Sequence, residues 1–230
     1  MSDPAFHLKI PNGQLKLGKG EWAHGAVTSG HSRGRISNVD INELVSSLTA
    51  AGDKVQGVLE LPYSIQFAGK NAGEMRRSLN GNGKLAITKG RIAALDLVAS
   101  IQRALVTSQQ ETEGTKGSTP FNTLTADLTA AQSRLNLDGI VLDGPALRAT
   151  GKGVIDFDQN IRFDLDARVT GGVARLFNQV ARRSQQEEAT VPLVVTGTVD
   201  APRVRPSVAR MATGAALGLL DSLFNKKKTP

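Results

Sequence analysis

The sequence contains no cysteine and few aromatic residues. The lack of cysteine excludes disulfides, thiolate zinc or iron–sulfur sites and cysteine nucleophiles. Aromatic side chains make up 4% of the 230 residues, so the core must be aliphatic, and stacking platforms for bases or sugar rings are hard to assemble. The three histidines, His7, His24 and His31, lack the close spacing of a zinc site. The sequence therefore predicts neither a metal site nor a cofactor.

Long hydrophobic runs are also missing. The longest weakly polar stretch, residues 211–220, is far shorter than the roughly 20 residues that a membrane-spanning helix needs. The N-terminus lacks a basic segment followed by an apolar one, so we expect neither a signal peptide nor a membrane anchor in this chain. The net charge of +7, from 28 basic and 21 acidic residues, suits anionic membranes and nucleic acid alike.

Apolar and polar residues alternate with a period of two in several segments. The longest such segments are residues 55–67, 147–157 and 161–169, and shorter ones occur at 15–17, 85–87, 135–137 and 191–199. Strands with one apolar and one polar face are typical of antiparallel sheets that are wet on one side. Asp158, Gln159 and Asn160 supply turn chemistry between two of these segments, which should pair antiparallel. The pattern predicts a mainly β, antiparallel fold and excludes a doubly wound one.

Helical spacing is confined to the connections and the C-terminus. The predicted helices cover residues 41–48, with Asp40 and Glu43 as a capping box, and residues 72–79, 94–106, 173–183 and 206–224. Residues 107–119 and 184–190 are almost entirely polar and are predicted to be loops. We therefore expect a domain at 1–205 and, at 206–230, an amphipathic helix with a basic tail. From the pattern alone, the helices could seal the apolar face of the sheet as in an ordinary sandwich.

Several glycine-punctuated blocks resemble one known family. They are residues 78–92 (SLNGNGKLAITKGRI), which lead into Leu95, Asp96 and Leu97, and residues 119–124, 135–142, 144–153, 156–157, 191–198 and 201–206. In this order, the blocks are similar to the C-terminal region of the AsmA family. The resemblance covers roughly residues 38–206 and is most specific over 78–157.

The resemblance implies a periplasmic protein of diderm bacteria that is anchored in the inner membrane at its N-terminus. It implies an antiparallel, strongly curved sheet that forms a groove or partly open barrel, with short helices covering its ends. Members of the family resemble bridge-like lipid carriers that support phospholipid transport and outer-membrane assembly. Because no anchor is recognised here, the resemblance implies that the chain is part of a longer polypeptide whose N-terminal remainder is missing.

Other residue patterns in the sequence give little support for catalysis or for nucleic-acid binding. Residues 30–34 (GHSRG) match the nucleophile elbow of hydrolases, but no helix follows directly and no histidine lies downstream, so a glycine-rich turn is favoured. The carboxylates of Asp164 and Asp166 share a strand face with Arg162 and Arg168, which is typical of a solvated surface rather than an acid/base pair. The basic clusters lack interleaved aromatics, so no nucleic-acid partner is expected.

We therefore predict a non-enzymatic lipid-binding or lipid-transfer module whose partners are phospholipid acyl chains. The residues predicted to line its groove are Leu59, Leu61, Ile65, Phe67, Leu147, Ile155, Phe157, Ile161, Phe163 and Leu165. The last helix is predicted either to cap the sheet or to contact an anionic membrane surface through Leu219, Leu220, Leu223, Phe224, Lys226, Lys227 and Lys228. The alternative is a scaffold in outer-membrane biogenesis that recruits a partner by strand addition without carrying lipid.

Overall fold

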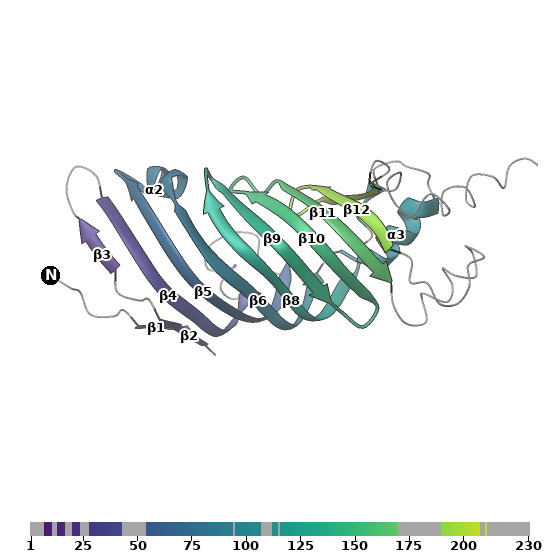
Figure 1. Cartoon of the computed structure of the whole chain (residues 1–230), viewed down its shortest axis with the longest axis horizontal. Coiled ribbons are helices and arrows are strands. Elements are labelled where there is room, and N and C mark those ends of the chain that lie inside the picture. The colour runs from purple at the N-terminus through teal and green to yellow at the C-terminus, as the bar shows by residue number, and fades with distance from the viewer. Residues whose placement is uncertain are drawn as a thin grey trace, which may run out of the picture.

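Within the part of the chain that is described, the protein is one antiparallel sheet with two short helices (Figure 1). The computed structural model describes residues 7–10, 13–16, 20–23, 28–42, 54–93, 95–106, 112–114, 116–169, 190–207 and 210. The first six strands are β1 (His7–Ile10), β2 (Gly13–Lys16), β3 (Gly20–Ala23), β4 (Thr28–Asp40), β5 (Val55–Gly69) and β6 (Asn80–Ala93). The others are β7 (Thr112–Glu113), β8 (Ser118–Ala131), β9 (Arg134–Asp143), β10 (Leu147–Asp156), β11 (Ile161–Val169), β12 (Thr190–Gly197) and β13 (Pro202–Pro206). The helices are α2 (Ala72–Ser78) and α3 (Leu97–Val106).

The strands follow one another across the sheet almost in chain order. The order is β1-β2-β4-β5-β6-β8-β9-β10-β11-β12-β13-β7, and β3 pairs with β4 beside β2. Every strand pairing is antiparallel. Among the described strands, β1 and β7 stand at opposite ends of this order and do not pair with each other, so the sheet is not closed into a barrel. The predicted mainly β, antiparallel fold with few helices is confirmed.

The segments with clear alternation are strands, as predicted. Residues 55–67 lie in β5, and the next two segments are β10 and β11, which pair from Leu147 opposite Val169 to Ile155 opposite Ile161. The turn between them contains Gln159, whose φ of 69° lies in the left-handed region. The hairpin predicted from the turn residues Asp158, Gln159 and Asn160 is therefore confirmed.

The helices at 72–79 and 94–106 are present, but the second begins later than predicted. The Asp96 side chain accepts a hydrogen bond from the Ala99 backbone N–H at 2.9 Å, so Asp96 caps α3 and the helix begins at Leu97. Of the predicted 41–48 helix, only residues 41 and 42 are described, and both are helical. The predicted helix at 173–183 lies outside the described residues, as does nearly all of the one at 206–224.

Two predictions about connections are wrong. Residues 107–119, predicted as a loop, contain β7 and the beginning of β8, because backbone pairing with β13 stabilises even a polar two-residue strand. Pro206, predicted to begin the last helix, ends β13 opposite Leu193. Proline is tolerated there because it terminates a short strand near the edge of the sheet.

Candidate functional site

One face of the sheet is apolar along rows of side chains that run across the strands. Residues that are paired in an antiparallel register lie on the same face, so the rows can be read from the pairing. We call one row the helix-rim row, because it lies toward the strand ends next to α3; it consists of Val39, Leu59, Ile87, Leu124, Leu142, Ala149, Ala167 and Val191. The turn-rim row lies toward the opposite strand ends and consists of Ser32, Ile65, Gly81, Ala130, Leu135, Ile155 and Ile161. Together with the residues between them, these rows define the apolar face.

Burial on the apolar face decreases from the helix-rim row to the turn-rim row. All members of the helix-rim row except Leu124 are at most 4% exposed. The large side chains of the turn-rim row are only half-buried: Ile65, Leu135, Ile155 and Ile161. The apolar face is therefore dry along one side and partly accessible along the other.

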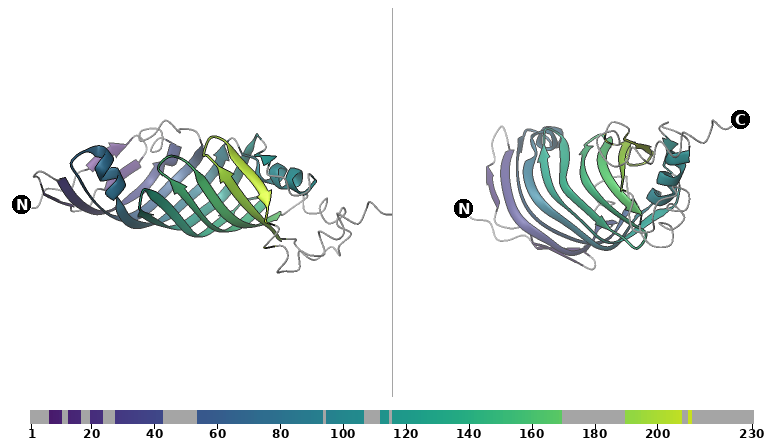
Figure 2. Two further views of the ribbon diagram at one scale, coloured as in Figure 1. Left: turned by 90° about the horizontal axis from the view of Figure 1, so that it is seen from above. Right: turned by 45° about the vertical axis from the view of Figure 1, so that its right-hand side comes forward.

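Helix α3 packs against β13, β7 and β8 at one end of the sheet. Leu97 and Ile101 of α3 are 3% and 0% exposed and belong to the same core cluster as Leu59, Ile87 and Val204. The helix contacts β13 as well as β8, although these strands are far apart in the sheet (Figure 2). Leu97 and Ile101 therefore extend the buried core at this end of the sheet.

The buried hydroxyl of Thr119 holds the beginning of α3 against β8. It donates a hydrogen bond to the Leu95 carbonyl at 2.7 Å and accepts one from the Leu97 backbone N–H at 2.9 Å. Both backbone groups lie in the turn that leads into the helix, where helical partners are lacking. One side chain therefore ties the beginning of α3 to β8.

We expect Thr119→Val to lower the free energy of unfolding by about 1 to 3 kcal/mol, because it leaves two buried backbone groups unpaired at nearly unchanged volume. Urea denaturation measures the change. Thr123→Val, at an exposed position of the same strand, is the control and should change stability by less than about 0.5 kcal/mol. Equal stability of the two variants would contradict the role of Thr119.

Aromatic side chains on the apolar face lie opposite glycines in neighbouring strands. Phe163 is paired with Gly153, and Phe121 with Gly90; a Cβ atom on either glycine would overlap the phenyl ring of its partner. Tyr63 stands between Gly34 and Gly83. Gly90 and Gly153 therefore provide the space that the rings of Phe121 and Phe163 occupy on an otherwise aliphatic face.

The turn rim is formed by helix α2 and by the hairpin turns at 132–133 and 157–159. Helix α2 packs on the end of β5, where the Ala68 backbone N–H donates to Ser78 Oγ at 2.8 Å. From α2, the Arg76 guanidinium lies 5.8 Å from the centre of the Phe157 ring in the turn after β10. The two turns are joined because the Phe157 backbone N–H donates to the Ser133 carbonyl at 3.0 Å. An apolar strip on the sheet thus meets a polar rim with an exposed cation.

The carboxylate of Asp156 organises the β10–β11 turn. Its carboxylate accepts hydrogen bonds from the Asn160 side chain at 2.9 Å and from the backbone N–H groups of Asp158 and Asn160. The hydrogen bond from the Asn160 side chain is the largest of the causes that lower the pKa of Asp156 below its usual value of 3.8. The group is therefore ionised at neutral pH and is held in a structural role.

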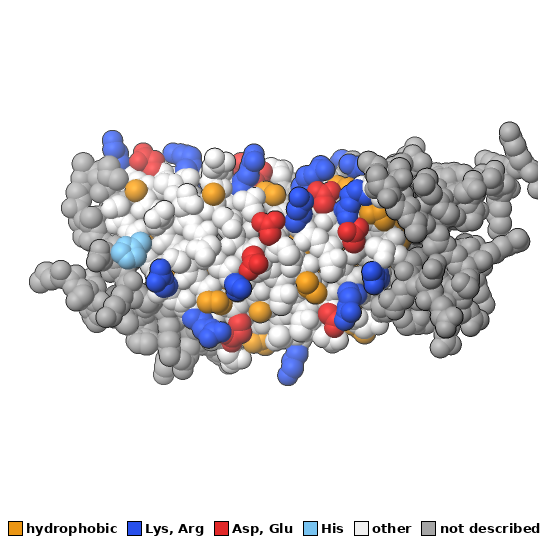
Figure 3. Space-filling view, in the orientation of Figure 1, with side chains coloured by type: hydrophobic (Ala, Val, Ile, Leu, Met, Phe, Trp, Pro, Cys, Tyr) orange, Lys and Arg blue, Asp and Glu red, His pale blue; other side chains and the backbone are white. Residues whose placement is uncertain are grey.

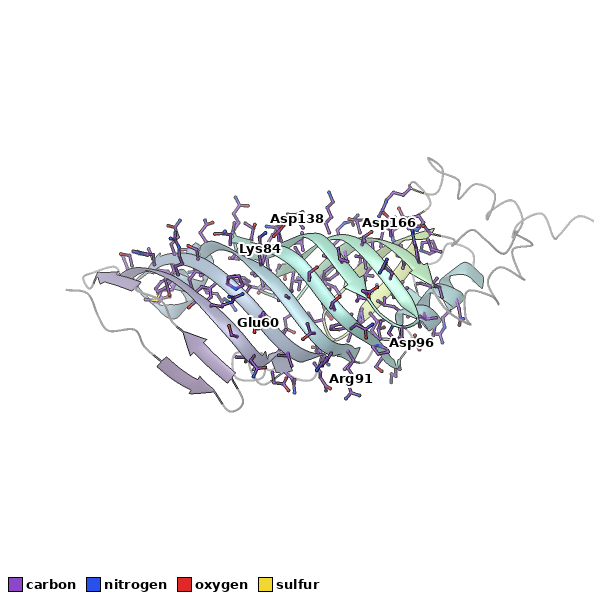
Figure 4. The ribbon with its side chains drawn as sticks, turned by 60° about the horizontal axis from the view of Figure 1, so that its bottom comes forward. Glu60, Lys84, Arg91, Asp96, Asp138 and Asp166 are labelled. Carbon is purple, nitrogen blue, oxygen red and sulfur yellow. The ribbon has the colours of Figure 1, made fainter. Side chains whose placement is uncertain are left out.

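The opposite face of the sheet is polar and charge-balanced. Figure 3 shows one side of the sheet on which basic and acidic side chains are interspersed and hydrophobic ones are few. Charged residues such as Glu60, Lys84, Asp138 and Asp166 extend from β5, β6, β9 and β11 (Figure 4). Asp164 pairs with Arg162 at 3.5 Å, and Asp166 pairs with Arg210 rather than with Arg168. The interpretation of these aspartates as surface charges agrees with this arrangement.

The structure separates the predicted groove residues into two groups. Leu59, Leu147 and Leu165 are at most 8% exposed and belong to the core cluster. The half-buried group consists of Leu61, Ile65, Phe67, Ile155, Phe157, Ile161 and Phe163. The prediction that Phe157 belongs to the strand alternation is wrong. Phe157 lies in the turn after β10, because the strand ends at Asp156. The predicted membrane-contacting residues of the last helix lie outside the described residues.

The serine motif at 30–34 forms no nucleophile elbow. It lies inside β4, and Ser32 is a 7% exposed member of the turn-rim row. The predicted glycine-rich turn is therefore wrong: the motif is a stretch of β4 in which Gly30 and Gly34 are paired with Phe67 and Tyr63 of β5. In the described ranges, no three potential metal-ligating side chains come together, and no helix is both long and apolar enough to cross a membrane.

Sequence reasoning missed several residues of the apolar face. Tyr63 was part of the alternating segment but carried no predicted role, and Leu135 stood in a short segment. In β8, the signal was present as Leu124, Ala126 and Leu128 alternating with polar residues. Comparison of the chain with models of protein families, with curated proteins and with solved structures finds no match. The family resemblance therefore remains a prediction.

Proposed function

We propose that this protein is a non-enzymatic lipid-binding module in which acyl chains lie on the turn-rim side of the apolar face. The observation that carries the proposal is the gradient of burial: large aliphatic side chains stay half-buried along the turn-rim row, although the helix-rim row beside it is dry. A methylene group that leaves water contributes roughly 0.8 kcal/mol, so a chain of about fifteen carbons needs a long apolar surface that is not already covered. The half-buried members of the turn-rim row, Ile65, Leu135, Ile155 and Ile161, offer part of such a surface.

The dimensions of this row suit an acyl chain. It crosses the sheet from β4 to β11, and neighbouring strands are about 4.8 Å apart, so six spacings give a row about 29 Å long. One leaflet of a bilayer is about 15 Å thick in its hydrocarbon region. The row is therefore long enough for one extended chain or for two shorter ones in succession.

We further propose that the sheet is rolled into an open trough with the apolar face inside. Lys54 precedes β5 and Asp200 precedes β13, which stand seven positions apart, or about 34 Å in a flat sheet. The Lys54 Nζ atom nevertheless lies 2.9 Å from Asp200 Oδ1. The bent strands in the right-hand view of Figure 2 also support a rolled sheet.

The turn rim provides a place for a polar headgroup. Arg76 and Arg77 are exposed in the last turn of α2, and neither has a carboxylate partner among the described residues. An anionic phosphate group would be attracted to them while the acyl chains remained on the apolar face. This arrangement and the resemblance to the AsmA family together favour a phospholipid ligand, a periplasmic location, an inner-membrane anchor in the full-length protein, and a role in phospholipid transport and outer-membrane assembly.

We expect phospholipid to co-purify with the protein at a fixed ratio. The experiment is organic extraction of the purified protein followed by mass spectrometry, with an unrelated protein of similar size purified in parallel to measure carry-over. Acyl chains that fill the turn-rim side should survive extensive washing, because they are shielded from water. A folded protein without lipid above carry-over would contradict the proposal.

The open end of the sheet favours a second candidate function. Among the described strands, β1 pairs only with β2, so its other edge is available for strand addition. On this alternative, the protein is a scaffold that binds a partner by its sheet edge without carrying lipid. A lipid-free, cooperatively folded monomer in the extraction experiment would favour this alternative.

A further inference from the structure

The hydroxyl of Tyr63 is an unusual polar atom on the apolar face. Tyr63 is the single tyrosine of the chain, and its hydroxyl oxygen is shielded from solvent. Within the part of the chain that the structure describes, this oxygen has no hydrogen-bond partner. Buried polar groups nearly always have such a partner, so an unpaired phenol donor calls for an explanation.

The cross-strand neighbours of Tyr63 supply no side-chain acceptor. Across the strands it stands opposite Gly34 and Gly83, which have no side chains, and the next residues on its own side of β5 are Leu61 and Ile65. The backbone groups of the flanking strands are engaged in the sheet ladder. A phenylalanine would fill the same space without an unpaired donor.

We propose that the Tyr63 hydroxyl donates a hydrogen bond to an ester carbonyl oxygen of a bound diacyl phospholipid. This inference rests on the proposed function, because the carbonyl is brought in by the acyl ligand. Tyr63 lies one row from Ile65 and on the same strand as the half-buried Phe67, so it is next to the surface proposed for the acyl chains. The exposed arginines of α2 lie beyond the end of this strand, where a headgroup attached to those carbonyls would be found.

The ester carbonyl is the ligand group that fits best. It is an acceptor without a donor, so it pairs with the phenol and leaves no new unpaired hydrogen on an apolar surface. It also stands at the boundary between the hydrocarbon chain and the polar headgroup of a phospholipid. A donor between an aliphatic strip and a cationic rim matches this order of groups.

The test compares an ester lipid with its ether analogue, which lacks the carbonyl oxygens. Binding of dihexanoylphosphatidylglycerol and of the corresponding dihexyl ether, both below their micelle concentrations, is measured by titration calorimetry on the full chain. We expect the wild-type protein to prefer the ester lipid by about tenfold, as for one buried hydrogen bond. Tyr63→Phe should lose this preference and bind the ether lipid as well as the wild type does.

The control variant is Ser64→Ala, which removes a hydroxyl from the other face of the same strand and should keep the preference for the ester. Without lipid, Tyr63→Phe should be at least as stable as the wild type, because it removes an unpaired donor. Loss of stability in this variant would reveal a structural partner for the hydroxyl and overturn the inference. So would equal affinity of the wild type for the two lipids, although lipid binding would then stand. Failure of the wild type to bind either lipid would instead overturn the proposed function itself.

Discussion

Replacement of Ile65 by aspartate is expected to reduce the lipid that co-purifies with the protein by at least about tenfold while the protein stays folded. Ile65 is half-buried in the turn-rim row and is not among the hydrophobic residues packed against the core cluster. A carboxylate there remains partly hydrated when the surface is empty, but it would have to lose water when an acyl chain covers it. The measurements are lipid content after extraction and cooperative unfolding in urea.

The matched control is Ser64→Asp. Ser64 is the next residue of β5, but it faces the other side of the sheet, opposite the exposed Arg33. The same charge added there should leave both lipid content and stability nearly unchanged. If both aspartate variants retain lipid, the turn-rim row does not bind acyl chains; if Ile65→Asp fails to fold, this part of the face is ordinary core.

Leu147→Ala is expected to have the largest effect on stability, a loss of about 2 to 5 kcal/mol in the free energy of unfolding. Leu147 is 1% exposed, lies opposite Val169 and belongs to the core cluster that includes Ile101 of α3. Truncation removes contacts and leaves a cavity that the sheet and helix cannot both collapse to fill. Thermal and urea unfolding measure the loss.

Thr150→Ala is the control for this variant. Thr150 is exposed on the polar face of the same strand, so its truncation should change stability by less than about 0.5 kcal/mol. A small effect of Leu147→Ala would mean that the core cluster is loosely packed around Leu147, contrary to its low exposure. The contrast with Ile65 tests whether the burial gradient separates core from binding surface.

The antiparallel sheet could be predicted because its long strands carry their pattern in large side chains. In β5, Leu59, Leu61 and Ile65 alternate with polar residues, and the same is true of β10 and β11, which are joined by turn residues. Such alternation directly reports one dry face and one wet face.

Strand β4 could not be predicted in the same way. Its positions on the apolar face include Gly30, Ser32 and Gly34, which are paired with Phe67, Ile65 and Tyr63 of β5. Hydrophobic periodicity is therefore absent from β4 alone and becomes visible only when its neighbour is known. The apolar face of β4 is therefore recognised from its pairing with β5 and not from its own sequence pattern.

The division of the predicted groove into buried and half-buried residues also could not be read from the sequence. Leu59 and Ile65 are both large aliphatic residues on the same side of the same strand, and their alternation is identical. Leu59 is 2% exposed and belongs to the core cluster, whereas Ile65 is half-buried and lies outside it. Periodicity gives the face of a residue but not what covers it.

The short pairing of β7 with β13 has a consequence for the order of folding. Nearly all other strand pairs join segments that are close in the chain, so they can form one after another with little loss of loop entropy. Thr112 and Val204, by contrast, are about 90 residues apart, and only two residue pairs reward that closure. We therefore expect the consecutive antiparallel strands to pair first and the β7–β13 contact to form last. Until then, the apolar face is exposed in a partly folded protein that chaperones can bind.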